Sequence, residues 1–360
     1  YFKKKKKDEK KKKEKRTITT PEKVAGRLIM SLRNVSFNYT ETDGMLLPGF
    51  AGETNLLGMG DNLGGYGAPS LAFVSGAQNR DLFGRPTTVW DGGSEFAPWA
   101  AGNGWLVDYS ALNIQHTITH SQNINGRIQL EPFKDLSISL TLDRKFNEND
   151  NSFFRYNDSL PTPDWEHQNR VTGGSLNFTT ITWKTAYTRI NDTLYTDKIF
   201  SEMRNYRKTV SEQLGTEAGT ALGADGYYDG FGDNQQDVLI GSFLAAYTGR
   251  GSNNKFFDIF KAIPLPNWDI RYDGLSKFEF MKKYVRNFTL KHAYRSTISL
   301  SNYQTNLGAF DEFGTQLRDA SNNFIAANQI SGVTITEQFA PFLGVDATWI
   351  VGKNGLITSF

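Results

Sequence analysis

The stretch "DLSISLTLDR", residues 135–144, decides the fold because its side chains alternate strictly in polarity. The apolar positions are Leu136, Ile138, Leu140 and Leu142, and the polar positions between them are Ser137, Ser139 and Thr141. Successive side chains of a β-strand point to opposite faces, so this strand has one apolar and one polar face. In a soluble sandwich the apolar face covers a core, whereas in an outer-membrane barrel it meets lipid. Alternation alone leaves both arrangements open.

The composition favours strands with aromatic girdles and long polar loops. Of the 360 residues, 13% are aromatic and 34 are Gly, while the hydrophobic fraction is only 38%. No stretch approaches the roughly 20 successive apolar residues that a membrane-spanning helix needs, which excludes a helical membrane protein. The absence of Cys excludes disulfides, thiol catalysis and Cys-ligated zinc.

The charge is distributed unevenly along the chain. Residues 1–16 carry eleven basic and three acidic side chains, a charge of +8, so the remainder carries −6. We expect residues 1–26 to form a Lys-rich mobile segment, although such a block also suits anionic lipid. Aromatic residues do not interleave with the lysines, so no nucleic-acid partner is predicted. The chain starts without Met and stops inside a strand-like pattern, so we expect it to be part of a longer polypeptide.

Long alternating runs predict barrel strands over residues 27–190 and 263–360, with a long loop at 41–104 inside the first region. The runs 27–40, 105–118 and 175–190 each change phase by one residue, as a β-bulge does. The segment "EPFKD", residues 131–135, is a tight turn. Short turns at one rim and long loops at the other are typical of outer-membrane barrels.

Residues 191–262 form an insertion in which helical spacing replaces alternation. One helix is predicted within 197–215, because Ile199, Met203, Tyr206, Val210 and Leu214 recur at helical spacing. A second, shorter helix is predicted at 237–249. We expect both helices to pack on the rim or in the lumen of the barrel.

No catalytic constellation or cofactor site is predicted, so the chain is expected not to be an enzyme. His116 and His120 have the HxxxH spacing of a zinc-binding helix, but on a strand they lie about 13 Å apart and cannot share one ion. They are therefore expected to be interfacial or lumen histidines. The aspartates of "ADGYYDGFGDNQQD" do not follow the EF-hand spacing and favour a solvated turn over a calcium site. No metal site is predicted.

Several long strings of the sequence resemble one family. These strings are "IPLPNWDIRYDGLSKF" (263–278), "LKHAYRSTISLSNY" (290–303), "GMLLPGFAGETNLLGMG" (44–60) and the hairpin around "EPFKDLSISL". They resemble the SprA/Sov family, the outer-membrane translocon of the type IX secretion system of Bacteroidota. The resemblance extends over nearly all 360 residues but matches only part of the C-terminal portion of a much longer protein.

The resemblance implies an arc of a very large antiparallel transmembrane β-barrel in the cell outer membrane, with a small helical insertion. It implies a wide pore for folded cargo and a lateral opening that a PorV-like shuttle barrel or a periplasmic plug protein occupies. The implied partners are outer-membrane lipid, the remainder of the same polypeptide and secreted cargo proteins. Some members of the family also serve gliding motility. No cofactor is implied.

The resemblance also implies a facing for the alternating residues. The expected lipid-facing residues are Leu136, Ile138, Leu140, Leu142, Phe288, Leu290, Tyr294, Ile298 and Leu300. The expected lumen-facing residues are Ser137, Ser139, Thr141, Lys291 and Arg295. The expected interfacial aromatics are Trp183, Tyr187, Trp268 and Trp349, which singly suit a protein core equally well.

Two rival functions remain open at this point: a TonB-dependent receptor or porin, and a soluble β-rich adhesin or carbohydrate-binding module. A receptor or porin would close its own barrel, whereas about eight to ten strands favour an arc that does not close on itself. Counting strands also puts the turn near "LSKFEFMKKY" and the similar turn "EPFKD" at opposite rims. One further strand between the two turns would place both turns at the same rim.

Overall fold

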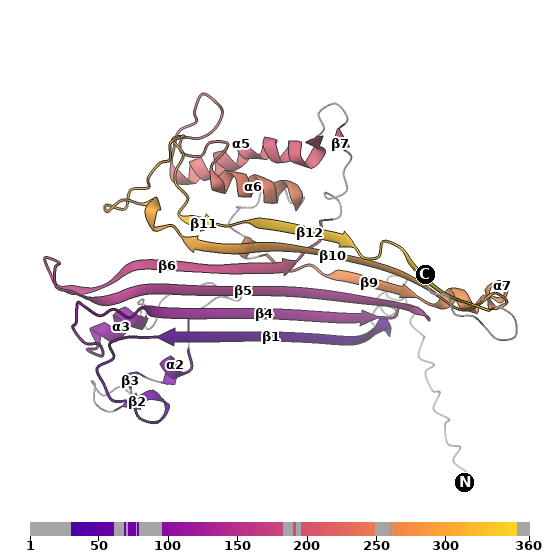
Figure 1. Cartoon of the computed structure of the whole chain (residues 1–360), viewed down its shortest axis with the longest axis horizontal. Coiled ribbons are helices and arrows are strands. Elements are labelled where there is room, and N and C mark those ends of the chain that lie inside the picture. Colours follow the sequence, from indigo (N-terminus) through magenta and orange to yellow (C-terminus); the bar gives the residue numbers. More distant parts are fainter. Residues whose placement is uncertain are drawn as a thin grey trace, which may run out of the picture.

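The computed structural model describes residues 30–60, 68–69, 71–76, 78, 96–182, 190–191, 196–248, 259–260 and 262–350. These residues form mostly antiparallel β-sheet with a few helices, which confirms the predicted all-β class (Figure 1). The expected Lys-rich segment 1–26 lies outside the described residues.

The main sheet contains nine strands. They are β1 (Leu32–Leu46), β4 (His116–Leu130), β5 (Leu136–Asn157), β6 (Asp164–Thr179), β9 (Asn267–Tyr272), β10 (Val285–Thr305), β11 (Asn328–Ile330), β12 (Val333–Phe339) and β13 (Gly344–Trp349). The short pairs β2 (Met59–Gly60) with β3 (Ala68–Pro69) and β7 (Ile190–Asn191) with β8 (Thr196–Asp197) stand apart from it. The helices are η1 (Leu56–Gly58), α2 (Leu71–Val74), α3 (Phe96–Gly102), α5 (Lys198–Ala218), α6 (Gln236–Tyr247), η3 (Gly274–Lys277), α7 (Glu279–Lys282) and η4 (Leu307–Ala309).

Several of the nine strands are consecutive pieces of a single path across the sheet. β6 and β9 both pair with β5 on one side and with β10 on the other. β9 lies in line with β6, nearer to the turn between β4 and β5. β11, β12 and β13 likewise pair with successive parts of β10. The sheet is therefore a meander of six strand paths (Figure 1).

The sheet is open at both edges. Within the described residues, β1 pairs only with β4, and β11, β12 and β13 pair only with β10. The first and last strands do not pair with each other, so the prediction of an arc that does not close on itself is confirmed for the described chain.

The division of one strand into β6 and β9 explains why the two similar turns share a rim. Thr179 ends β6, and the carbonyl of Thr179 accepts a 2.9 Å hydrogen bond from the backbone N–H of Leu265, so the insertion between them leaves and returns at one point. The chain then completes the crossing as β9. The turn after β9 contacts the β4–β5 turn, where the N–H of Asp273 donates to the carbonyl of Asp135 at 2.9 Å and Lys277 forms an ion pair with Asp135.

The structure corrects several predicted strand boundaries. β1 continues to Leu46, and the connection that follows it ends only at His116, so the predicted loop 41–104 is displaced and the predicted strand 105–118 is wrong. The phase change in 27–40 is a register shift between Leu32 and Asn34, as predicted. The phase change in 175–190 instead marks the end of β6, where the chain leaves the sheet.

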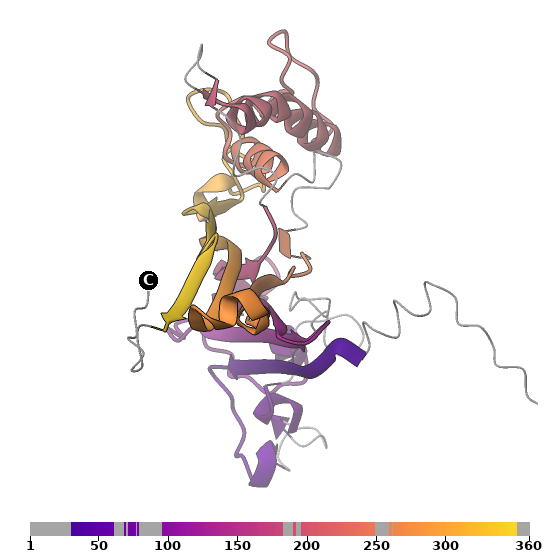
Figure 2. The same cartoon turned by 90° about the vertical axis from the view of Figure 1, so that its right-hand side faces the viewer.

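The two predicted helices of the insertion are confirmed as α5 and α6, which lie together at the β11–β12 side of the sheet (Figures 1 and 2). Leu244 of α6 and Ala262 belong to a buried apolar cluster with residues of β5, β6 and β10. Its sheet members are Phe146, Leu176, Phe178, Ile298, Leu300 and Tyr303. The insertion therefore packs on the apolar side of the sheet.

A second apolar cluster lies at the β1 side, near the long connection between β1 and β4. Phe96, Ala97 and Ala100 of α3 pack there with Trp105 and with Phe154 of β5. The rings of Trp99 and Trp105 meet edge to face at 4.8 Å. Long connections thus cover one half of the apolar side, and the short-turn half lies beyond them (Figure 1).

A clasp of two loops, residues 219–235 and 306–327, fixes the helical insertion to the sheet. Arg318 binds Asp229 through two hydrogen bonds of 2.8 and 2.7 Å, and its guanidinium lies 4.3 Å from the ring centroid of Phe324. The N–H of Phe324 donates to the carbonyl of Gly230 at 2.8 Å. Gly230 has a φ of +84°, and an added Cβ would lie 2.2 Å from the Phe324 ring. Only Gly fits this position without displacing the ring.

Gly230→Ala should loosen the insertion, because the new methyl group displaces Phe324 and the residue must also keep a positive φ. We expect faster protease cleavage within residues 198–248. Gly314→Ala is the matched control, since Gly314 has a φ of +79° in the partner loop but open space around its Cβ position. Equal cleavage of the two variants would contradict the clasp.

The clasp should also depend on pH. The hydrogen bonds from Arg318 hold the pKa of the Asp229 carboxyl below its ordinary value. A carboxyl whose pKa is lowered by folding stabilises the fold above its unfolded pKa of about 3.9, and the stabilisation is lost as pH falls through the lower folded pKa. Protease protection should therefore favour wild type over Asp229→Asn at pH 5, and the difference should shrink steadily as the pH falls below about 3.9. A difference that does not change with pH would refute this role of the carboxylate.

Candidate functional site

The sheet has one apolar and one polar face across its full width, because its register keeps the alternation of neighbouring strands in phase. Residues paired directly across two strands share a face. Leu140 pairs with Ile128 and with Trp268, and Trp268 pairs with Tyr294. Ser139 pairs with Gln129 and with Asp269. The two residue classes of the opening stretch thus continue into separate surfaces.

The apolar face carries a band near the short-turn rim, which we call the apolar band. Its members on five strand paths are Val35, Phe37, Ile124, Ile128, Leu130, Leu136, Ile138, Leu140, Leu142, Ile270, Phe288 and Leu290. Phe37 is 67% exposed and Val35 is 54% exposed. From Leu136 to Leu142 the band is about 20 Å tall at roughly 3.3 Å per residue.

Gly126 allows the band to pack closely. It lies between Phe37 of β1 and Leu142 of β5, and an added Cβ would lie 2.8 Å from Cγ of Leu142. The side chain of Leu142 fills the space above it, so the apolar surface continues across the glycine.

Three of the expected lipid-facing residues are covered by the chain itself. Ile298 and Leu300 are buried in the cluster that includes Leu244 of α6 and Ala262. Tyr294 is also buried, and its hydroxyl accepts a 2.8 Å hydrogen bond from the N–H of Thr182. The expectation of lipid contact is wrong for these three because the insertion starts at the end of β6 and covers this part of the face. Phe288 and Leu290 remain partly exposed.

The expected interfacial aromatics have different surroundings. Trp183 and Tyr187 lie outside the described residues. Trp268 stacks on Tyr294 with ring centroids 4.3 Å apart, next to the covered part of the apolar face. Trp349 is 44% exposed at the end of β13, where it pairs with Val285 near the short-turn rim. The surroundings of Trp349 and Trp268 are thus compatible with an interfacial position, which stays a prediction for both residues.

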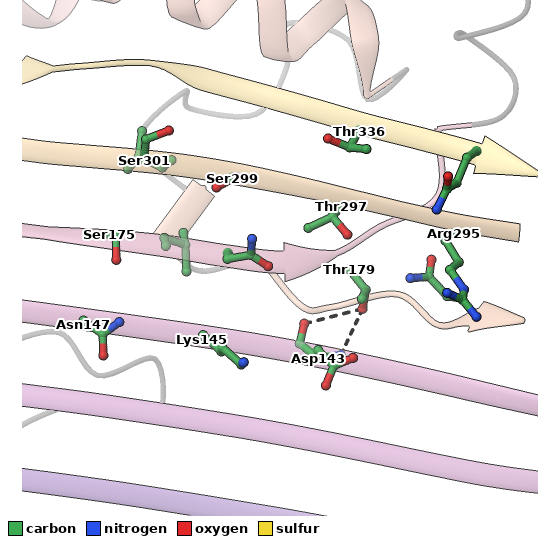
Figure 3. Close-up of a pocket in the computed structure, with 15 residues that line it drawn as sticks. Asp143, Lys145, Asn147, Ser175, Thr179, Arg295, Thr297, Ser299, Ser301 and Thr336 are labelled. Atoms are coloured by element: carbon green, nitrogen blue, oxygen red, sulfur yellow. Dashed lines mark hydrogen bonds between the residues drawn. The ribbon is translucent and has the colours of Figure 1, made fainter. Parts of the chain in front are cut away.

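The polar face contains an open trough of about 780 Å³, which is our candidate functional site (Figure 3). Its polar lining comes from β5, β6, β9, β10 and β12. The residues are Asp143, Lys145, Asn147, Ser175, Asn177, Thr179, Asn267, Arg295, Thr297, Ser299, Ser301, Thr336 and Gln338. Charges of both signs alternate with amides and hydroxyls, an arrangement that water solvates well.

The trough lies where β6 ends and β9 begins. The hydroxyl of Thr179 accepts a 3.1 Å hydrogen bond from the N–H of Asp143, which satisfies the β5 backbone at the gap (Figure 3). The side chain of Asn267 accepts a 2.9 Å hydrogen bond from the N–H of Ser296 on the other side. Side chains therefore take over part of the pairing that a continuous strand would provide at the gap between β6 and β9.

The five expected lumen-facing residues all lie on the polar face. Ser137, Ser139 and Thr141 pair with Arg271, Asp269 and Asn267 of β9. Lys291 pairs with Arg271 and forms an ion pair with Asp346 of β13. Arg295 is exposed and lines the trough. The structure thus groups these residues on one surface, as the alternation in the sequence predicts.

A buried polar layer, which was not predicted from the sequence, lies on the apolar side beyond the apolar band. Every second residue of β5 after Leu142 lies on the same face as Leu142 and is buried as far as residue 152. These residues are Arg144, Phe146, Glu148, Asp150 and Ser152. Arg144 is only 1% exposed and donates to the side chain of Gln122 and to the carbonyl of Phe260, the latter at 3.0 Å. From Arg144 to Ser152 the residues of this phase are mostly polar, so the sequence shows no alternation of polarity there and nothing in it marks them as buried.

His116 and His120 belong to this layer, so the expectation of interfacial or lumen histidines is wrong. Both are buried, because long connections of the chain cover this half of the apolar side. Their different neighbours agree with the argument that they cannot share an ion: the His116 ring lies 5.8 Å from that of His167, whereas Nδ1 of His120 lies 2.6 Å from Asp43.

Arg144→Met should loosen the cover over the sheet, because it removes the hydrogen bond to Phe260 and leaves that carbonyl without its donor. A lost hydrogen bond to a charged group costs about 1.5–3 kcal/mol, so amide exchange in α6 should accelerate about tenfold or more. Arg155→Met is the control, since Arg155 bonds Gln168 far from the insertion. Unchanged exchange in Arg144→Met would show that the insertion is held without it.

Comparison with known proteins gives no assignment: no protein-family model and no curated protein matches the chain. Among the described residues, no helix, including the 21-residue α5, is long and apolar enough to cross a membrane.

Proposed function

We propose that the chain is an arc of the wall of a very large outer-membrane barrel through which folded proteins pass, as in the type IX secretion translocon of the SprA/Sov family. The observation that carries the proposal is that the apolar band and the polar face lie on opposite sides of a sheet whose two edges have no further strand partner among the described residues. The resemblance of the sequence to the family gives the proposal its specific form.

The apolar band suits the hydrocarbon region of a bilayer. Outer-membrane barrels carry an outward apolar band about 25 Å tall, and the apolar run from Leu136 to Leu142 supplies about 20 Å of it, measured along the tilted strand. Side chains such as Phe37 and Val35 are exposed on it, and lipid would remove that apolar surface from water at about 25 cal/mol per Å². Aromatic residues at the short-turn rim, among them Phe133, Phe280 and Tyr284, suit the headgroup region.

The open edges suit an arc that other strands of the same polypeptide complete. β1 is 15 residues long, and its outer edge has no strand partner among the described residues. A long unpaired edge is a template for strand addition and for aggregation. Neighbouring wall strands would satisfy its backbone groups inside a membrane, where unpaired groups are especially costly.

The polar face suits the water-filled interior of such a barrel. The trough presents mostly amides, hydroxyls and both signs of charge, and Leu176 and Leu300, the apolar residues along it, are buried. Folded cargo would therefore move along a hydrated surface without tight binding. The long-loop half rises past the bilayer, since the 22 residues of β5 span about 70 Å. Shuttle or plug partners would find their contacts there.

Leu140→Arg should block assembly and Ser139→Arg should not. Leu140 lies between Ile128 and Trp268, where an Arg would face hydrocarbon at a cost of about 2–4 kcal/mol. An Arg at position 139 lies opposite Asp269 on the polar face. Heat-modifiable electrophoretic mobility and membrane yield measure the outcome. Equal defects in both variants would contradict the facing of the strand.

The function itself is tested by removing the chain from the cell that makes it. We expect the chain to resist carbonate extraction, and its loss to trap folded secreted proteins in the periplasm. Intact secretion with a carbonate-resistant chain would favour a receptor or porin instead. Release by carbonate would indicate a soluble module and would overturn the proposal.

A further inference from the structure

Three potential metal ligands meet on β1 and β4 at the boundary between the apolar band and the buried polar layer. Nδ1 of His120 lies 2.6 Å from a carboxylate oxygen of Asp43 and 3.9 Å from one of Glu41. One ligand atom from each of the three residues lies within 4.8 Å of the other two. The cluster combines an imidazole with two carboxylates.

The sheet holds the three side chains together through its regular geometry. Glu41 and Asp43 are two residues apart on β1, so they point to the same face, and His120 is the direct partner of Asp43 on β4. Gln78 donates to the carbonyls of Gly44 and Thr119 at 3.1 and 2.9 Å, which fixes the two strands just beyond the cluster. Two ligands from one strand and a third from its neighbour form a rigid tripod.

His120 is the observation that distinguishes this cluster from a group of surface acids. Its side chain is 0% exposed and lies against Phe146, with ring centroids 5.8 Å apart. Its Nε2 is buried without a hydrogen-bond partner among the described residues, and its Nδ1 points into the cluster. Packing therefore fixes the orientation of the imidazole ring. The carboxylates of Asp43 and Glu41, which lie beside Nδ1, are 19% and 33% exposed.

We propose that Glu41, Asp43 and His120 bind one divalent transition-metal ion of the zinc type. Imidazole and carboxylate ligands hold Zn²⁺ at about 2.0–2.2 Å, which separates tetrahedral ligand atoms by roughly 3.3 Å. The two distances from Nδ1 of His120, 2.6 and 3.9 Å, lie on either side of this value, and all three ligand atoms lie within 4.8 Å of one another, so rotation of the partly exposed carboxylates would bring them to it. Water fills the fourth position.

A second layer of contacts orients the outer ligand. The hydroxyl of Tyr39 donates to the other carboxylate oxygen of Glu41 at 2.7 Å and accepts a 3.2 Å hydrogen bond from Gln122. Hydrogen bonds of this kind hold ligating carboxylates in place in metal sites. The HxxxH spacing is not involved, because His120 acts without His116. The bound ion would join β1 to β4.

The test is Zn²⁺ binding to the full detergent-solubilised chain, measured by competition with a chromophoric chelator. We expect one ion per chain, a loss of at least tenfold in affinity for Asp43→Asn and His120→Gln, and a smaller loss for Glu41→Gln. His116→Gln and Glu131→Gln are the matched controls, a buried histidine of the same strand and an exposed glutamate of the other rim. Ca²⁺ should not compete, because imidazole is a poor ligand for it.

Asp43 is partly exposed, so Asp43→Asn keeps the fold and tests the site even if His120→Gln does not fold. X-ray absorption at the zinc edge should show nitrogen and oxygen ligands only. Absence of stoichiometric binding, an equal loss in His116→Gln, or displacement by equimolar Ca²⁺ would each overturn the site. None of these results depends on what the polar face meets, so the proposed function is tested separately.

Discussion

The structure depends on the two-residue period of β5, held in register by hydrogen-bonded neighbours on both edges. β4 pairs with one edge from Leu130 opposite Ile138 to His116 opposite Ser152, and β6 and β9 share the other. A shift of one residue would exchange the two faces and expose the apolar side chains to water. Because each neighbour repeats this register, a single alternating strand sets the character of the whole sheet.

The same register leads to several local environments along one face. Near the short turns the apolar phase is filled by Leu, Ile and Phe and remains partly exposed. Farther along, the same phase is filled by Arg144, Glu148 and Asp150, and the long connections and the insertion cover them. Buried charges need partners, and these three find them in the carbonyl of Phe260, in Tyr303 and in Arg170 respectively. The proposed bilayer zone and the proposed metal site meet at this boundary.

The fold class, the two helices and the grouping of side chains on two faces were predictable from the sequence, because each rests on a local period. The joint role of β6 and β9 was not, since the two halves of that strand path are separated by residues 180–266. Burial of Ile298, Leu300 and Tyr294 was equally inaccessible, because α6 and the segment after β6 reach them only through tertiary contacts. The cluster of Glu41, Asp43 and His120 requires the β1–β4 register, which no single strand reveals.

The central claim is that one face of β5 meets lipid and the other meets water. The chain contains no Cys, so single cysteines at residues 136–143 can carry spin labels without background. Collision rates with oxygen, which concentrates in lipid, and with a water-soluble nickel chelate should then be measured on the membrane-embedded protein. The account predicts high oxygen access at 136, 138, 140 and 142 and high nickel access at 137, 139, 141 and 143. Equal nickel access at both sets would show that the apolar band meets water, and the account would be wrong.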